Sequence, residues 1–143
     1  METRLTLEPR IAAMAAVRAS HEDIDYLNLC VARGENAANW GKWARWDATF
    51  HRTIAISSRN TILAGFVDII NKTRRSQYQH YVRQQATKSD WRPILVEQHR
   101  IIVRAIAAHD PGGAAQAMRE HLRGVEERLF GDMEDLAEFV EKL

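Results

Sequence analysis

Residues 43–54 read Trp43-Ala44-Arg45-Trp46-Asp47-Ala48-Thr49-Phe50-His51-Arg52-Thr53-Ile54. On an α-helix, Asp47 and His51 face the same way because they are four residues apart. Trp43, Phe50 and Ile54 lie at helical spacing around them and mark that face as the one that turns toward the core. An unpaired carboxylate is costly in a core, so this stretch predicts a buried partner for Asp47 and His51.

Two further histidines lie on apolar helix faces in the same way. The neighbours of His99 on its face are Leu95, Ile102, Val103 and Ile106, and those of His121 are Ala117, Met118 and Val125. Helical bundles build metal centres from inward side chains on facing helices. Imidazole nitrogens with one carboxylate oxygen suit zinc, and also nickel, cobalt, manganese or iron. The pattern predicts a divalent metal site formed by Asp47, His51, His99 and His121, with zinc expected, nickel or manganese as alternatives, and a coordination position left for water or an anion.

A hydrogen-bonded core histidine is the simpler interpretation of any one of these side chains, but the joint pattern favours a metal site. Structural or solvent-facing roles are predicted for the other candidates, which are His21, His80, His109, the tryptophans Trp40, Trp43 and Trp46, the small buried thiol of Cys30, and the Arg74-Arg75 pair on a solvated face.

The composition is that of a soluble globular domain. The chain has 143 residues, 45% of them apolar and 27% charged, which fits one domain with a real core. Its formal charge is +1 and its charged residues are interleaved, so it lacks the basic patch that nucleic-acid binding needs. A single cysteine and the lack of a long apolar run favour a reducing, cytoplasmic location.

Helix-breaking residues divide the chain into six or seven predicted helices, which are expected to form an all-α antiparallel bundle. Ser20 and Asp23 form a predicted capping box, and Asp110 followed by Pro111 is the clearest helix start. Gly131 is predicted to separate a last short helix, and Pro9 is expected near a helix start or at a kink. The expected helices cover residues 5–19, 20 to beyond 31, 40–58, 61–85, 93–108, 111 to about 130, and 133–140, with a loop over residues 34–39.

Seven segments together resemble the FCD domain, the ligand-sensing C-terminal half of the FadR subfamily of GntR-type transcriptional regulators. The resemblance extends from Arg4 to Leu129. Its segments are Arg4-Leu-Thr-Leu-Glu8, Ala12-Ala13-Met14-Ala15-Ala16, Asp47-Ala-Thr-Phe50-His51, Ser57-Ser-Arg-Asn60, Glu97-Gln-His99, Ala105-Ile106 and His121-Leu122.

The resemblance implies an all-α antiparallel bundle that acts as a homodimer. It also implies that Asp47, His51, His99 and His121 hold a divalent cation at the floor of a cavity, where a small carboxylate effector completes the coordination. Arg4 matches an arginine that pairs with the effector's carboxylate. Asn60 matches an asparagine whose role is either helix capping or lining of the effector pocket.

The resemblance also implies that operator DNA is bound only through a winged helix-turn-helix, for which there is no room before Arg4. The chain is therefore expected to be either a fragment of a longer regulator or a free-standing sensor. Two alternatives stay open. A metal-dependent hydrolase or isomerase needs a general base, and the only nearby candidate, Glu97, should point away from the metal. If the metal has a purely structural role, we expect a closed coordination shell with no cavity or arginine beside it.

Overall fold

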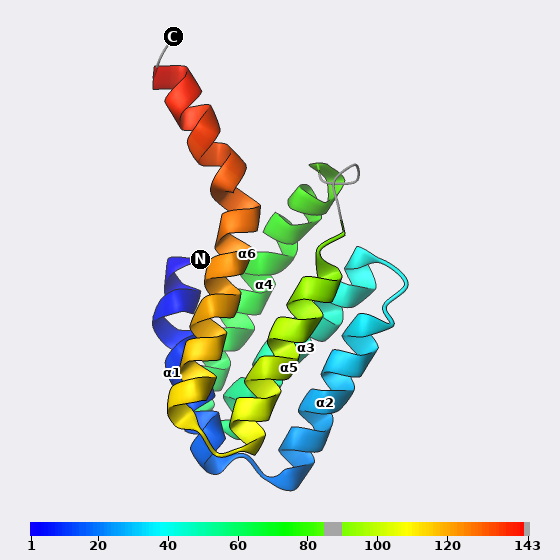
Figure 1. Ribbon diagram of the computed structural model, residues 1–143, viewed down its shortest axis with the longest axis vertical. Coiled ribbons are helices and arrows are strands. Elements are labelled where there is room, and N and C mark those ends of the chain that lie inside the picture. The colour runs from blue at the N-terminus through cyan, green and yellow to red at the C-terminus, as the bar shows by residue number, and fades with distance from the viewer. Residues whose placement is uncertain (85–89, 142–143) are drawn as a thin grey trace.

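The computed structural model describes residues 1–84 and 90–141, with side chains over residues 1–74 and 90–129. The described residues form six helices and no strand, which confirms the predicted all-α class. Figure 1 shows the helices lying along a common long axis, with the end of α6 extending beyond the others. The helices are α1 (Glu2–Arg18), α2 (His21–Glu35), α3 (Trp40–Ser57), α4 (Thr61–Gln84), α5 (Arg92–Ala107) and α6 (Pro111–Glu141).

Side-chain caps are present at the starts of α2, α3 and α6, and those of α2 and α6 were predicted. Ser20 and Asp23 form the expected capping box at α2. Asn39 accepts a hydrogen bond from the Lys42 backbone at α3, and Asp110 accepts one from the Gly113 backbone at α6. These side chains satisfy backbone N–H groups that the first turn of a helix leaves unpaired.

Three expected boundaries are wrong. Helix α1 begins at Glu2, so Pro9 lies inside it, and the i,i+4 ion pair of Arg4 with Glu8 stabilises the turn before the proline. Helix α2 continues to Glu35, so the loop is shorter than predicted. Helix α6 continues through Gly131, because a single glycine costs a helix only about 1 kcal/mol and does not end it without a capping contact.

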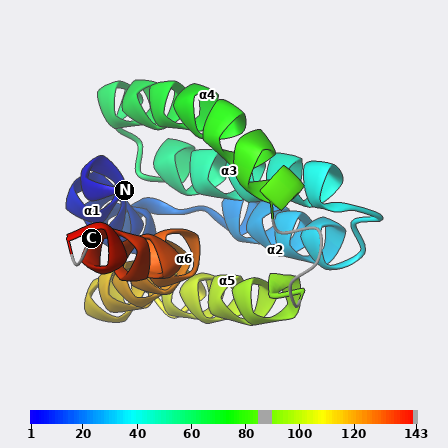
Figure 2. The ribbon, with the colours of Figure 1, turned by 90° about the horizontal axis from the view of Figure 1, so that it is seen from above.

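Five helices pack around one interior. Helix α1 packs against α3, α5 and α6, while α2 packs against α3 and α5. Helix α4 lies along the outer side of α3 (Figure 2). The main apolar core includes Phe50, Ile102 and Met118, and a second cluster forms around Trp43 and Trp91. None of the described helices is long and apolar enough to cross a membrane.

Candidate metal centre

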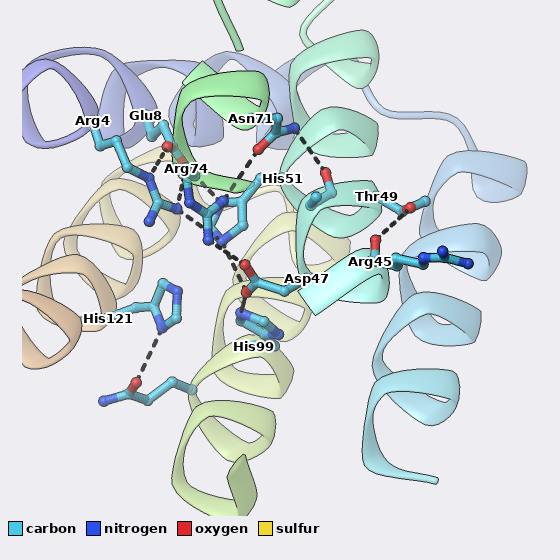
Figure 3. A network of polar contacts seen from close by, with 12 residues as sticks. Arg4, Glu8, Arg45, Asp47, Thr49, His51, Asn71, Arg74, His99 and His121 are labelled. Carbon is cyan, nitrogen blue, oxygen red and sulfur yellow. Dashed lines mark hydrogen bonds and ion pairs between the residues drawn. The ribbon is translucent and has the colours of Figure 1, made fainter. Parts of the chain in front are cut away.

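The four predicted metal ligands meet in the interior of the bundle. Helix α3 supplies Asp47 and His51, α5 supplies His99 and α6 supplies His121. Each of the four residues is 4% exposed or less. One potential ligand atom from each residue lies within 4.8 Å of those of the others. Figure 3 shows these side chains converging from separate helices, as the apolar stripes predicted.

The distances suit a metal ion at the centre of the cluster. Asp47 Oδ1 lies 3.3 Å from Nε2 of His99 and 3.6 Å from Nε2 of His51. Two ligand atoms that bind one tetrahedral zinc at about 2.1 Å are separated by about 3.4 Å. Within the described part of the chain, Nε2 of His99 and Nε2 of His121 are buried without a hydrogen-bond partner. A metal ion would satisfy both nitrogens, so the donor set fits a divalent cation.

Each of three candidate ligands also has a partner on the atom that faces away from this centre. His51 Nδ1 lies 2.5 Å from Glu8 Oε2, a contact within ion-pair distance in which no hydrogen bond is formed. His121 Nδ1 lies 3.1 Å from Gln98 Oε1, and Asp47 Oδ2 accepts a short hydrogen bond from Arg74. Such outer partners fix the orientation of metal ligands in known metal sites.

The solvated role predicted for Arg74 is wrong. Its side chain is only 17% exposed and reaches from α4 to the buried Asp47. Asn71 accepts a hydrogen bond from Arg74 and donates one to the backbone carbonyl of Ala48, which ties this arrangement to α3. The side chain of Arg75, like that of His80, lies outside the described residues.

Burial and neighbouring charges set the protonation of the cluster. Burial lowers the pKa of His99, and burial together with His99 lowers the pKa of His121 well below its usual value. Burial opposes ionisation of Asp47, but its neighbours, foremost the Arg74 guanidinium, outweigh it and hold the pKa of Asp47 well below its usual value. Metal ligation requires neutral imidazoles and ionised carboxylates, and these shifts favour those forms.

The two predicted effector residues lie in different places. Arg4 is buried beside the cluster, where its Nε donates to Glu8 Oε1 at 2.6 Å and its Nη2 lies 3.2 Å from His51 Nε2. Asn60 follows the end of α3, where its side-chain oxygen accepts a hydrogen bond from the Leu63 backbone. This contact is the helix-capping alternative, and an effector contact for Asn60 stays a prediction.

The remaining predicted side chains include two histidines and a glutamate at the surface and one tryptophan beside the cluster. His21 is exposed, and His109 contacts the backbone oxygen of Ala16 at 2.8 Å. Glu97 is exposed and forms an ion pair with Arg104, so it points away from the candidate ligands as predicted. Trp43 is buried and stacks near His99, with ring centroids 6.3 Å apart.

Comparison with known families matches residues 1–124 to the FCD domain model. The chain belongs to the FCD domain family of GntR-type transcriptional regulators. It is 29% identical over 146 residues to the Exu regulon transcriptional regulator of Escherichia coli K12, a match that covers 97% of this chain and 54% of that relative. It is 30% identical over 145 residues to a protein of the same strain named for regulation of an L-lactate dehydrogenase operon, with 96% and 53% covered. These relatives are named as regulators, not as enzymes.

Solved structures agree with this assignment of the FCD domain. A GntR protein of Streptococcus agalactiae superposes with a TM-score of 0.73 at 30% identity, covering 89% of this chain and 56% of that one. The McbR/YncC protein of E. coli superposes with a TM-score of 0.80 at 18% identity, covering 92% and 66%, which shows the shared fold. The chain spans about half the length of the curated relatives described above. The match to the FCD domain model identifies it as the effector-binding domain of a GntR-type regulator.

Replacing Arg74 by methionine should weaken metal binding. Without Arg74 the carboxylate of Asp47 loses the partner that orients it, and loss of such a partner typically lowers metal affinity by about 10- to 100-fold. Competition with a chromogenic chelator measures this change. Arg52→Met is the matched control. Arg52 on α3 forms an ion pair with Asp68 on α4, so it also joins these two helices, but this ion pair is exposed to solvent. Equal metal affinities for the two variants would contradict the role of Arg74.

Stability of the chelator-treated protein should fall as the pH drops below about 6.5, the ordinary histidine pKa. Because the folded-state pKa values of His99 and His121 are lowered, the unfolded chain binds more protons than the folded chain in this range. Each of these histidines then lowers the free energy of unfolding by on the order of 1 kcal/mol for each unit by which the pH falls. Lowered carboxylate pKa values, such as that of Asp47, contribute only below about pH 4.

Urea denaturation between pH 7.5 and 5.0 measures this dependence. In the variant His99→Gln, the free energy of unfolding should change less steeply with pH than in the parent. The control variant His21→Gln, which replaces an exposed histidine, should keep the pH dependence of the parent. A free energy of unfolding that stays constant from pH 7 to pH 5.5 would contradict the prediction that both imidazoles are buried in the neutral form.

Proposed function

We propose that this FCD domain senses a small carboxylate metabolite through a bound divalent metal. In this proposal Asp47, His51, His99 and His121 hold the metal, with zinc as the expected ion and nickel or manganese as alternatives. The effector's carboxylate binds at the metal and pairs with Arg4. The metal acts as a Lewis acid that attracts an anion, and the chain's own residues position and select that anion.

The convergence of the four buried ligand atoms is the observation that carries this proposal. The chemistry of their surroundings adds support. Arg4 and Arg74 approach the cluster from α1 and α4, where Glu8 and Asp47 are their carboxylate partners. A guanidinium group has five N–H donors, so each arginine has further donors for the carboxylate of an effector. A site that combines a cation with two guanidinium groups suits an anionic ligand.

The same surroundings argue against the two alternative functions. A purely structural metal is expected to have a closed shell with neither a cavity nor an arginine beside it, and the presence of Arg4 and Arg74 argues against that alternative. A hydrolase or isomerase needs a general base apart from the ligands. Glu97 points to solvent, and Glu8 is already engaged by Arg4 and His51. The relatives named as transcriptional regulators also favour sensing over catalysis.

Within a complete regulator, this domain would act as a cytoplasmic homodimer. Operator DNA would be bound by a winged helix-turn-helix that lies outside this sequence. Effector binding would then change the relative placement of the two DNA-binding domains, as a population shift driven by the effector's different affinity for the two arrangements.

Tryptophan fluorescence during carboxylate titration tests the proposal, because Trp43 stacks near His99. A panel of small hydroxy acids begins with L-lactate, since one relative is named for an L-lactate dehydrogenase operon. We expect saturable binding of at least one acid to the zinc-loaded protein and loss of that binding after chelation. Lactamide, which lacks the carboxylate, is the matched control for L-lactate and should give no saturable change.

Two results of this titration would contradict the proposal. If no acid in the panel binds the zinc-loaded protein, the carboxylate-sensing role is wrong. If an acid binds equally before and after chelation, the metal has no part in effector recognition, and the arginines alone form the anion site.

A further inference from the structure

Arg4 contacts the nitrogen of His51 that a metal ion would bind. Its Nη2 lies 3.2 Å from His51 Nε2, and this same Nε2 faces Asp47 Oδ1 at 3.6 Å. Arg4 is 3% exposed, so this contact is made in the interior of the bundle. Figure 3 shows the guanidinium of Arg4 directed from α1 toward His51.

The Arg4 contact selects one tautomer of a neutral His51. A guanidinium group only donates hydrogen bonds, so a hydrogen bond from Arg4 requires His51 Nε2 to accept with its lone pair. The proton of a neutral imidazole then lies on Nδ1, which is 2.5 Å from the carboxylate oxygen Glu8 Oε2. This tautomer is also the one in which Nε2 can bind a metal ion.

We propose that Arg4 and the metal ion compete for the lone pair of His51 Nε2. When a metal binds, the Nη2 group of Arg4 leaves His51 and becomes available to the carboxylate of an effector. This inference rests on the proposed function, because it assigns an order to binding at the same site. The metal would bind first, and its binding would prepare the arginine that receives the effector.

Glu8 keeps Arg4 at the site during this exchange. Its Oε1 accepts a hydrogen bond from Arg4 Nε at 2.6 Å. Its Oε2, which faces His51 Nδ1, accepts one from Arg4 Nη2 at 3.4 Å. The guanidinium can therefore lose its contact with His51 without leaving its buried carboxylate partner. Glu8 is a positioning residue that contacts both Arg4 and His51 and keeps them next to each other.

The variant Arg4→Gln tests the competition through metal affinity alone. Glutamine keeps a donor for Glu8 but is too short to reach His51 in the same way. We expect zinc to bind this variant about tenfold more tightly than the parent, which corresponds to the loss of one competing hydrogen bond. Competition with a chromogenic chelator measures the affinity. Arg10→Gln, which removes an exposed arginine of the same helix, is the control and should bind zinc as the parent does.

A second variant, Arg4→Lys, separates competition from charge repulsion. Lysine keeps the positive charge, but its single nitrogen cannot contact Glu8 and His51 together as the guanidinium does. Tighter zinc binding in both Arg4 variants supports the competition. Tighter binding in Arg4→Gln with parent-like binding in Arg4→Lys would overturn it in favour of simple repulsion. Thermal unfolding without metal checks that both variants fold.

The remaining outcomes distinguish this inference from the proposed function. If the parent binds zinc and Arg4→Gln binds it equally or more weakly, the competition is overturned while the metal site stands. If the parent binds no divalent metal under any loading condition, the proposed function fails and the inference fails with it.

Discussion

An apolar core that contains one carboxylate and three imidazoles is stable only when their polar atoms find partners. In this FCD domain, Arg74 meets Asp47, Glu8 meets His51 and Gln98 meets His121. Nε2 of His99 and Nε2 of His121 have no hydrogen-bond partner within the described residues. A divalent cation would satisfy both inward nitrogens, so the donor set is consistent with a metal site.

The network around the cluster joins helices that are distant in sequence. Arg4 and Glu8 come from α1, Arg74 from α4, and the candidate ligands from α3, α5 and α6. A metal ion or an anion at the centre would therefore be connected, through these side chains, to five helices at once. On this account, the same contacts that stabilise the core provide the means by which an effector shifts the arrangement of the helices.

Helical periodicity was sufficient to predict that Asp47, His51, His99 and His121 face the interior. It could not reveal their outer partners, because a contact between helices depends on packing angles and rotations. Arg74 lies in a polar stretch that looks solvated in sequence, yet α4 directs it to Asp47. A signal for Glu8 was present in its i,i+4 spacing from Arg4. The helix break predicted at Gly131 is wrong, because one glycine is a weak helix terminator and α6 continues through it.

Metal content per chain is the most direct test of the central claim. Elemental mass spectrometry should be applied to protein purified without a chelator or a histidine tag, alongside the variant His99→Ala. We expect about one divalent metal ion per chain in the parent and loss of that ion in the variant. A parent protein that contains no metal, even after loading with zinc, nickel or manganese, would contradict the account.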